Sequence, residues 1–171
     1  VFSTNLEPLK AGARGWRNQH VRTRLREELR PVAISNCTLA RFGHPHDGGY
    51  LACANLLSAV TSAYSYGIEG RDEWGCAIAK TLGVPVHQYD CFDNRRPICE
   101  NAQAVFHDEC ISGVAEAIEG RSFDSLAHQI ARNGDQGKRL IVKMDVEGAE
   151  WDALLRADAA KLQSIDQLVI E

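Results

Sequence analysis

The stretch "KMDVEGAEWDALL", Lys143 to Leu155, follows an apolar run and places Asp145, Glu147 and Glu150 within six positions, around a glycine. A carboxylate at the end of a buried strand can accept a proton from a reacting hydroxyl when burial raises its pKa. Acids in the first turn of a helix are also favoured by the helix dipole, so we expect Glu150 to serve the helix start. Asp145 is therefore the first candidate for chemistry, and Glu147 is the second.

Further polar residues stand at or just beyond the ends of other expected strands: Glu69, Asp90, His107 and Asp108. In an open parallel sheet, ligands bind beyond the carboxyl ends of the strands, where the strand order switches direction. The sequence therefore predicts one site at this edge. An imidazole titrates near neutrality, which makes His107 or His46 an alternative base to Asp145.

The elements that position these residues alternate between strand and helix. We expect strands that end near residues 67, 90, 107, 145 and 171. Apolar spacing and end signals predict helices at 71–83, at 121–134 behind a Ser122 cap, and at 150–162. This order is typical of an α/β fold with a doubly wound, mostly parallel, Rossmann-like sheet.

Two of these helices, 71–83 and 150–162, have faces that we expect to point inward. The glycine-rich segment 42–50, which precedes the first strand, is predicted to be a loop. In the first helix the inward residues are Trp74, Ala77, Ile78 and Leu82, and in the last they are Trp151, Leu154, Leu155 and Leu162.

The chain of 171 residues is predicted to hold one domain behind a leading helix. Residues 15–30 are amphipathic and stop at Pro31, so we assign 1–40 to a helix and linker and 41–171 to the domain. The last residues, "QLVIE", resemble a strand cut at its end, and we expect a fragment that lacks the C-terminal strands of the sheet.

Composition excludes several classes of partner. A net charge of −4 gives no long-range attraction for nucleic acid, and no apolar run is long enough for a membrane span. The first residues do not have the order of a signal peptide, so we expect a cytoplasmic protein, although a fragment can lack its targeting segment. The sequence does not predict the oligomeric state.

The six cysteines have neither C-x-x-C pairs nor the spacing of a zinc site. We expect reduced, mostly buried thiols. A bridge between Cys91 and Cys99 is the alternative if the protein matures in an oxidising compartment.

The nature of the ligand follows from the first two strand ends. Gly67 and Gly70 allow a sharp turn, and Asp90 follows at a position where an acid can bind the hydroxyls of an adenosine ribose. The turn lacks the third glycine of a dinucleotide motif, and no phosphate clamp is evident, which disfavours a nicotinamide cofactor. A ligand with a ribose and a cation but no phosphates suggests S-adenosylmethionine.

The motifs "YSYGIEGRDEW", "VHQYDCFD", "VFHDECISG" and "LIVKMDVEGAEWDALL", in this order, resemble the FkbM-type methyltransferase family, which shares a K-x-D-x-E-G-x-E stretch after its fourth strand. The resemblance begins near Arg41 and is most specific at Lys143 to Trp151. The element "DGGYL", with Asp47 and Gly48, is similar to one upstream of the first strand in a branch of the family. Ser65 departs from the family pattern, which has an acid at this position.

The resemblance implies transfer of a methyl group from S-adenosylmethionine to a hydroxyl of a small molecule or glycan. By position, Tyr66, Gly67 and Glu69 would line the methionine part, with Glu69 or Asp47 replacing the acid missing at Ser65. Asp90 would bind the ribose and Asp145 would face the methyl group. The adenine edge would fall to Asp108 or Glu109.

Three alternatives remain open. The degenerate first turn fits a module that binds a cofactor or partner without catalysis, and a nicotinamide-dependent oxidoreductase could use the same sheet. A divalent metal could also activate the hydroxyl, with ligands from Asp145, Glu147, His44, His46 and Asp47, but no spacing among them is diagnostic, and we assign no metal site.

Overall fold

The computed structural model describes residues 19–171, and the chain divides between Asn36 and Cys37 into two units. In the first unit, residues 19–28 are helical, within the predicted helix; residues 15–18 lie outside the described part. Val21, Leu25 and Leu29 of this segment are exposed. Within residues 19–171 no helix is long and apolar enough to cross a bilayer.

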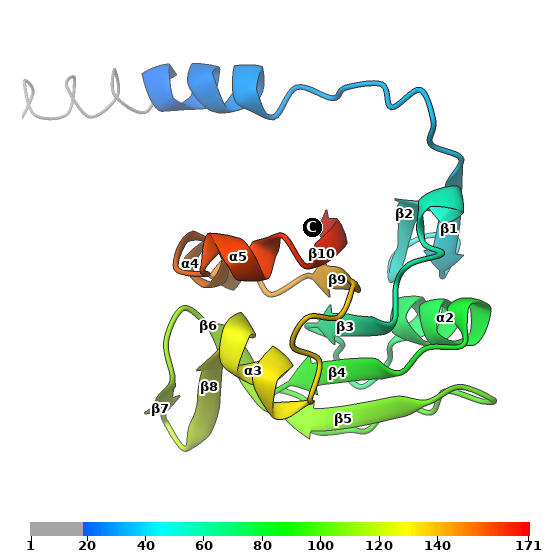
Figure 1. The fold of residues 1–171 in the computed structure, drawn as a ribbon. Helices are drawn as coiled ribbons and strands as arrows, with labels where there is room; N and C mark the ends of the chain where they lie inside the picture. The colour runs from blue at the N-terminus through cyan, green and yellow to red at the C-terminus, as the bar shows by residue number, and fades with distance from the viewer. Residues whose placement is uncertain (1–18) are drawn as a thin grey trace, which may run out of the picture. The chain divides into compact units, whose positions relative to one another are not determined.

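The second unit is built on a five-stranded parallel sheet with the order β10-β9-β3-β4-β5. Figure 1 shows β3, β4 and β5 side by side, with their arrowheads at the same end. The strands are β3 (Ser62–Tyr66), β4 (Val86–Asp90), β5 (Ala104–Asp108), β9 (Leu140–Met144) and β10 (Ile165–Ile170). Their ends confirm the predicted ones to within a residue, and the order switches direction between β3 and β9.

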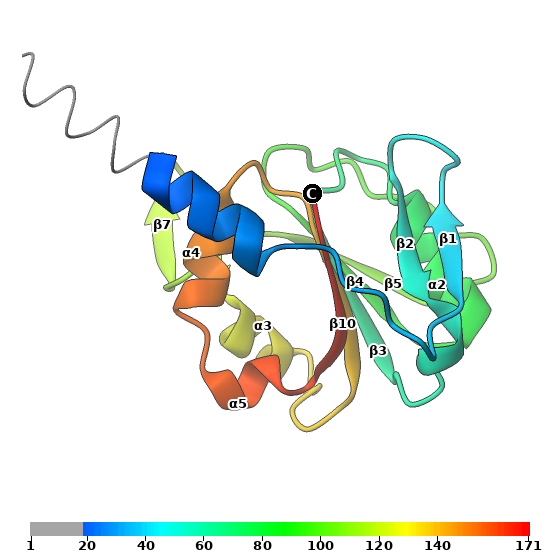
Figure 2. The same cartoon turned by 90° about the horizontal axis from the view of Figure 1, so that it is seen from above.

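Helices cover both faces of this sheet, as the uninterrupted burial of β3, β4 and β9 requires. Figure 2 shows α2 (Glu73–Leu82) and a hairpin of β1 (Leu39–Gly43) and β2 (Gly49–Cys53) on one side. α3 (Leu126–Arg132), α4 (Ala149–Leu155) and α5 (Ala159–Leu162) lie on the other. Each side has its own apolar core, because neighbouring residues of a strand point to opposite faces: Ile141 packs toward α2 and Leu140 toward α3.

The helix α2 forms as its sequence predicts. Asp72 caps its start by accepting a hydrogen bond from the Gly75 N–H, and Gly83 ends it in the left-handed conformation. Trp74 and Ile78 are buried, and Ala77 and Leu82 pack against the same core. The predicted inward face of this helix is therefore confirmed.

The segment 42–50 is not simply a loop, because its two ends are strand. β1 pairs antiparallel with β2 from Leu39↔Cys53 to Gly43↔Gly49. A short 3-10 helix, η1 (Ala54–Leu56), follows the hairpin. The sequence prediction failed here because alternation is weak in strands of five residues that contain glycine.

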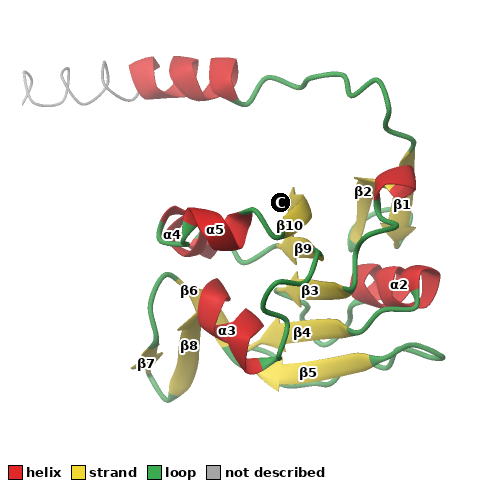
Figure 3. Ribbon diagram, viewed as in Figure 1, coloured by secondary structure: helices red, strands yellow, loops and turns green. Residues whose placement is uncertain are grey.

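The predicted helix 121–134 begins later than expected. Residues Arg121–Ser125 form β8, which pairs with β6 (Cys110–Ser112) and β7 (Glu116–Ile118) in a small second sheet, shown in yellow in Figure 3. Ser125, not Ser122, caps α3 by accepting from the His128 N–H. Pairing with two strands outweighs the helical spacing of 121–125.

The predicted helix 150–162 is split into α4 and α5, and its predicted face is partly wrong. Trp151 is 53% exposed and Leu155 is 82% exposed, whereas Leu154 and Leu162 pack against the core. The buried residues of α4 are Glu150 and Ala153. The helix starts at Ala149, and the face that packs inward, made by Glu150 and Ala153, is narrower than the predicted one.

All six cysteines form disulfides, which corrects the expectation of reduced thiols. Cys37 pairs with Cys53, Cys76 with Cys99, and Cys91 with Cys110, each pair with Cα atoms 5.1 Å apart. The alternative Cys91–Cys99 bridge is also wrong, because each of these two cysteines is bonded to a different partner. Spacing in the sequence does not determine connectivity.

We predict that the denatured, unreduced protein takes up no thiol-alkylating reagent and that the reduced protein takes up six equivalents per chain. Peptide mapping by mass spectrometry should recover a peptide joining Cys91 to Cys110. Free thiols in the unreduced protein, or a peptide joining Cys91 to Cys99, would contradict this pairing.

Candidate functional site

Two adjoining cavities lie at the carboxyl ends of β3, β4 and β9, where the strand order switches. The larger has a volume of about 530 Å³ and the smaller about 250 Å³. They share four lining residues: Asp47, Gly67, Glu69 and Asp145. The predicted site therefore corresponds to two adjoining cavities that share lining residues and not to a single pocket.

The larger cavity is strongly acidic. Seven carboxylates line it, and none of its described lining residues is a lysine, arginine or histidine. These acids are Asp47, Glu69, Asp90, Glu109, Asp145, Glu147 and Glu171. Tyr66, Tyr89, Phe92 and Ile111 add apolar surface. Such a wall favours a ligand that combines a positive charge with a flat apolar part.

The turn after β3 brings Gly67 against the end of β9. Gly67 has φ +71°, and a Cβ atom there would lie 1.7 Å from the Asp145 carbonyl oxygen. Its N–H donates to the Tyr89 carbonyl of β4 at 3.0 Å, while the Asp145 N–H donates to Tyr66 of β3 at 3.2 Å. Only glycine fits, because the neighbouring strand end passes directly over this residue.

Asp90 holds two turns around the larger cavity. One carboxylate oxygen accepts from the Ile68 and Glu69 N–H groups at 3.1 and 2.8 Å, and the other accepts from the Phe92 and Asp93 N–H groups at 2.8 and 2.9 Å. Both lone pairs of each oxygen are thereby used. Asp90 thus lines the cavity, as predicted, and at the same time fixes the backbone of Glu69.

Asp145 is held from one side by two donors. Its Oδ2 accepts from the Lys143 ammonium at 3.2 Å and from the Tyr50 hydroxyl at 2.9 Å. No described residue donates to its Oδ1, so this oxygen has acceptor capacity left. Asp145 lines both cavities.

Lys143 is buried and points toward the turn after β3. Besides Asp145, its ammonium donates to the carbonyl oxygens of Tyr66 and Gly67 at 3.2 and 2.8 Å. It also lies 5.4 Å from the centre of the Tyr50 ring. Three acceptors and an aromatic face compensate the buried charge, which ties the end of β9 to the end of β3.

Tyr50 joins two carboxylates from distant parts of the chain. Its hydroxyl contacts Glu171 as well as Asp145. Burial, followed by the hydrogen bonds to Glu171 and Asp145, raises the pKa of Tyr50 far above its ordinary value. The phenol therefore stays protonated, and its single O–H donates to one of these two acids at a time.

Glu147 and Glu150, the other two acids named in the stretch 143–155, lie in different environments. Glu147 is exposed, has φ +56° and lines the larger cavity. Glu150 is 2% exposed, and its Oε1 accepts from the Val146 N–H at 2.9 Å. Glu150 serves the turn into α4, as predicted, and is absent from both cavity walls.

Of the pair predicted for the adenine edge, Glu109 lines the larger cavity and Asp108 lines neither. Glu109 is buried and forms an ion pair with Arg132. It also accepts from Gln129 Nε2 at 3.0 Å. Its carboxylate is thus fixed from the α3 side.

His107 lines neither cavity. Its ring stacks on Tyr89 with centroids 4.3 Å apart, and its Nε2 lies 3.1 Å from His87 Nδ1. Burial, then the charges of His87 and Arg132, lower the pKa of His107 from 6.5 to about 4. The geometry separates this imidazole from Asp145 and disfavours it as the base.

Ser65 lines neither cavity and hydrogen-bonds to the residue that starts α2. It is fully buried and donates to Asp72 Oδ1 at 3.0 Å, the same oxygen that caps the helix. Gln88 Nε2 donates to the other Asp72 oxygen at 2.8 Å, and burial raises the pKa of Asp72. Ser65 therefore supports the helix start.

The β1–β2 turn supplies the remaining predicted residues. Asp47 lines both cavities, while Gly48, His44 and His46 line only the smaller one. Among residues 19–171 there is no cluster of three or more potential metal ligands.

Sequence reasoning missed Tyr50, Glu171 and the Cys91–Cys110 disulfide, all of which line the site. It also assigned no role to Lys143. The two cysteines had no diagnostic spacing. The position of Tyr50 close to Gly48 in the "DGGYL" element could have marked it as a site residue. Its hydrogen-bond partner Asp145, however, is 95 residues away in the sequence.

Comparisons with protein-family models, curated proteins and solved structures find no significant match to the chain. The site is therefore interpreted from its own geometry.

We predict that Gly67→Ala lowers the free energy of unfolding by roughly 2–5 kcal/mol, because it combines left-handed strain with a clash against the Asp145 carbonyl. Gly134→Ala is the matched control, since Gly134 has φ +72° and a Cβ atom added there would meet no other atom within 4 Å. The control should cost only about 1–2 kcal/mol. Equal losses in urea denaturation would contradict the close approach at Gly67.

The lowered pKa of His107 predicts a stability that falls in acid. The folded protein keeps the imidazole neutral, whereas the unfolded chain binds a proton below about pH 6.5. The stabilisation is complete above that pH and is lost as the pH falls toward 4. In urea titrations from pH 7 to 4.5, His107→Gln should show a weaker fall than the wild type; parallel curves would refute this.

Proposed function

We propose that this chain is an S-adenosylmethionine-dependent O-methyltransferase of the FkbM type. The observation that carries the proposal is the larger cavity, with seven carboxylates and no described basic side chain, at the switch point of the sheet. A sulfonium cation fits such a wall, and the volume of about 530 Å³ lies within the range of about 300–1,000 Å³ for ligand pockets.

The same cavity disfavours the oxidoreductase alternative. A dinucleotide brings a pyrophosphate, which needs backbone N–H groups or basic side chains. The N–H groups of the turn after β3 are engaged instead: Ile68 and Glu69 donate to Asp90, and Gly67 donates to Tyr89.

The residues assigned from the sequence take refined roles in this proposal. Tyr66, Gly67 and Glu69 line the methionine part, and the exposed ring of Phe92 offers apolar surface for the adenine. The main role of Asp90 is to hold the two turns through hydrogen bonds from backbone N–H groups. A ribose hydroxyl would have to replace one of these hydrogen bonds to bind Asp90. Glu109, fixed by Arg132, keeps its place at the adenine end.

Methyl transfer requires alignment of the acceptor oxygen, the methyl carbon and the sulfur more than it requires covalent catalysis by the protein. The acceptor oxygen attacks the methyl carbon, the carbon–sulfur bond breaks with its electron pair passing to sulfur, and neutral S-adenosylhomocysteine leaves. Asp145 takes the hydroxyl proton through its unused Oδ1 and passes it to solvent. Lys143 and Tyr50 orient this carboxylate by holding Oδ2.

Non-catalytic binding on the same fold remains the second candidate, and the observation that favours it is the engagement of Ser65 with Asp72 in place of an acid facing the cavity. Transfer of a labelled methyl group to a hydroxylated acceptor would reject it.

The disulfides bear on where this reaction takes place. Three disulfides are typical of oxidising compartments, where thiols are not kept reduced. We therefore favour such a compartment over the cytoplasmic location expected from the sequence.

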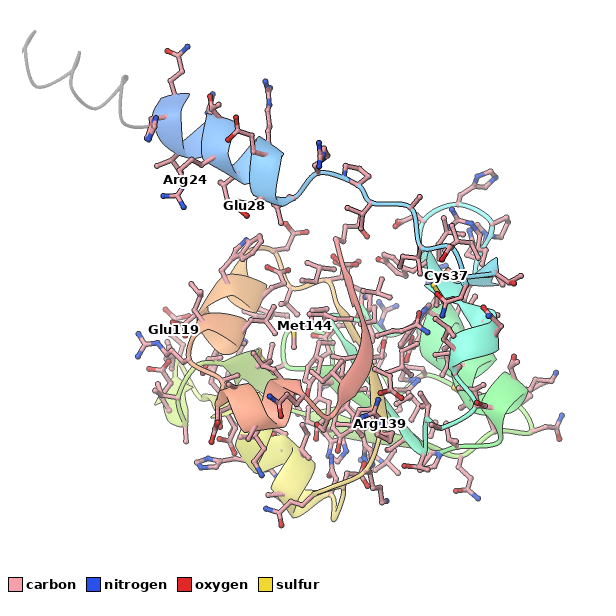
Figure 4. All side chains as sticks on the ribbon, turned by 45° about the horizontal axis from the view of Figure 1, so that its top comes forward. Arg24, Glu28, Cys37, Glu119, Arg139 and Met144 are labelled. Atoms are coloured by element: carbon pink, nitrogen blue, oxygen red, sulfur yellow. A yellow bond between two sulfur atoms is a disulfide. The ribbon has the colours of Figure 1, made fainter. Side chains whose placement is uncertain are left out.

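We predict that calorimetry detects binding of S-adenosylmethionine to the wild type and an affinity about tenfold or more lower for Glu69→Gln, which loses a charged hydrogen-bond partner. Glu119→Gln is the matched control: Glu119 is also an exposed glutamate with positive φ, 50° against 45° for Glu69. Figure 4 labels Glu119 at the periphery of the unit, away from the buried Met144 of β9. Absence of binding to the wild type would remove the basis of the proposal.

A further inference from the structure

We propose that the disulfide between Cys91 and Cys110 is a positioning element of the larger cavity, on which the affinity for S-adenosylmethionine and S-adenosylhomocysteine depends. The inference rests on the proposed function and adds a covalent requirement to it. Both cysteines line the larger cavity, whereas the cysteines of the other two disulfides line neither cavity.

The bond joins two acidic segments of the cavity wall. Cys91 directly follows Asp90 in the sequence, and Cys110 directly follows Glu109. Both carboxylates line the larger cavity. The last paired residues of β4 and β5 are Asp90 and Asp108, so the hydrogen-bonded ladder ends where the two segments begin. Beyond this point the disulfide holds them together covalently, with Cα atoms 5.1 Å apart.

The segment that contains Glu109 and Cys110 is anchored on α3. Gln129 Nε2 donates to Glu109 at 3.0 Å and to the Cys110 carbonyl oxygen at 3.1 Å. Arg132 of the same helix forms an ion pair with Glu109. Glu109 and Gln129 are both buried, so this side of the cavity wall has a fixed position.

The segment that begins at Cys91 is an exposed connection. Residues 91–103, between β4 and β5, contain neither helix nor strand, and Phe92 is 75% exposed. Arg121 of β8 donates through Nε to the Cys91 carbonyl oxygen at 3.1 Å, and its guanidinium lies 4.5 Å from the centre of the Phe92 ring. The disulfide adds a covalent link from this exposed segment to the anchored one, and thereby places Phe92 beside the cavity.

Loss of this bond has two effects that can be measured separately. A disulfide stabilises a fold mainly by restricting the unfolded chain, to a degree set by the length of the closed loop. Cys91–Cys110 and Cys76–Cys99 span 19 and 23 residues, so their removal should destabilise the fold to a similar extent. Both also hold the connection 91–103. Loss of Cys91–Cys110, however, frees the cavity wall, and a ligand then has to order that wall when it binds.

The first test compares two double variants by calorimetry with S-adenosylhomocysteine and by urea denaturation. Cys91→Ser with Cys110→Ser should lower the affinity about tenfold. The matched control, Cys76→Ser with Cys99→Ser, should keep the affinity of the wild type while its urea midpoint falls by a similar amount. Unchanged affinity in both variants, or an equal loss in both, would overturn the proposal.

The second test uses the wild type and does not depend on the folding of a variant. The protein is equilibrated with reduced and oxidised dithiothreitol. The dithiol gives two electrons and two protons and becomes a cyclic disulfide, while a protein disulfide becomes two thiols. A ligand that binds the disulfide form about tenfold more tightly must, when saturating, shift this equilibrium about tenfold toward the disulfide. Alkylation and peptide mapping give the reduced fraction at each bond.

We expect saturating S-adenosylhomocysteine to shift the Cys91–Cys110 equilibrium toward the disulfide and to leave that of Cys76–Cys99 unchanged. A shift of neither bond, or the same shift of both, would overturn the proposal. The proposed function survives these results, because the ligand is bound in each case. If the wild type does not bind S-adenosylhomocysteine, the proposed function is contradicted, and the positioning role falls with it.

Discussion

The buried ammonium of Lys143 is the interaction on which the candidate site depends. It joins the carbonyl oxygens of Tyr66 and Gly67, at the end of β3, to the carboxylate of Asp145, at the end of β9. Burying a charge is costly unless it is paired and hydrogen-bonded, so the three acceptors have to stay in place around it. The two strands on either side of the switch point are thereby locked in register at the ligand edge.

Other features of the site follow from this connection between the ends of β3 and β9. The close approach of β3 and β9 leaves no room for a Cβ at residue 67. Asp90 fixes the far side of the same turn through backbone N–H groups, and Tyr50 reaches Asp145 from the hairpin. The backbone and three side chains thus position one carboxylate oxygen, Oδ1, at the junction of two cavities. Preorganisation of this kind is what a displacement reaction needs, because its rate depends on alignment.

The strand ends could be predicted from the sequence because apolar runs and glycine turns are local signals. The failures come from contacts that local spacing does not encode, some between neighbouring segments and some between distant residues. Residues 121–125 have helical spacing, yet they pair with β6 and β7. Tyr50 and Glu171 converge although they are 121 residues apart. The disulfides join segments that only the fold brings together, and α4 buries Glu150 because that side chain binds the turn before it.

The proposed function requires the acidic cavity to bind the methyl donor with its sulfur toward Asp145. A crystal structure of the protein with S-adenosylhomocysteine tests this most directly. We expect the adenosine in the larger cavity, beside Phe92, and the sulfur at the junction lined by Glu69 and Asp145. A ligand bound elsewhere, or one whose sulfur points away from the smaller cavity, would contradict it.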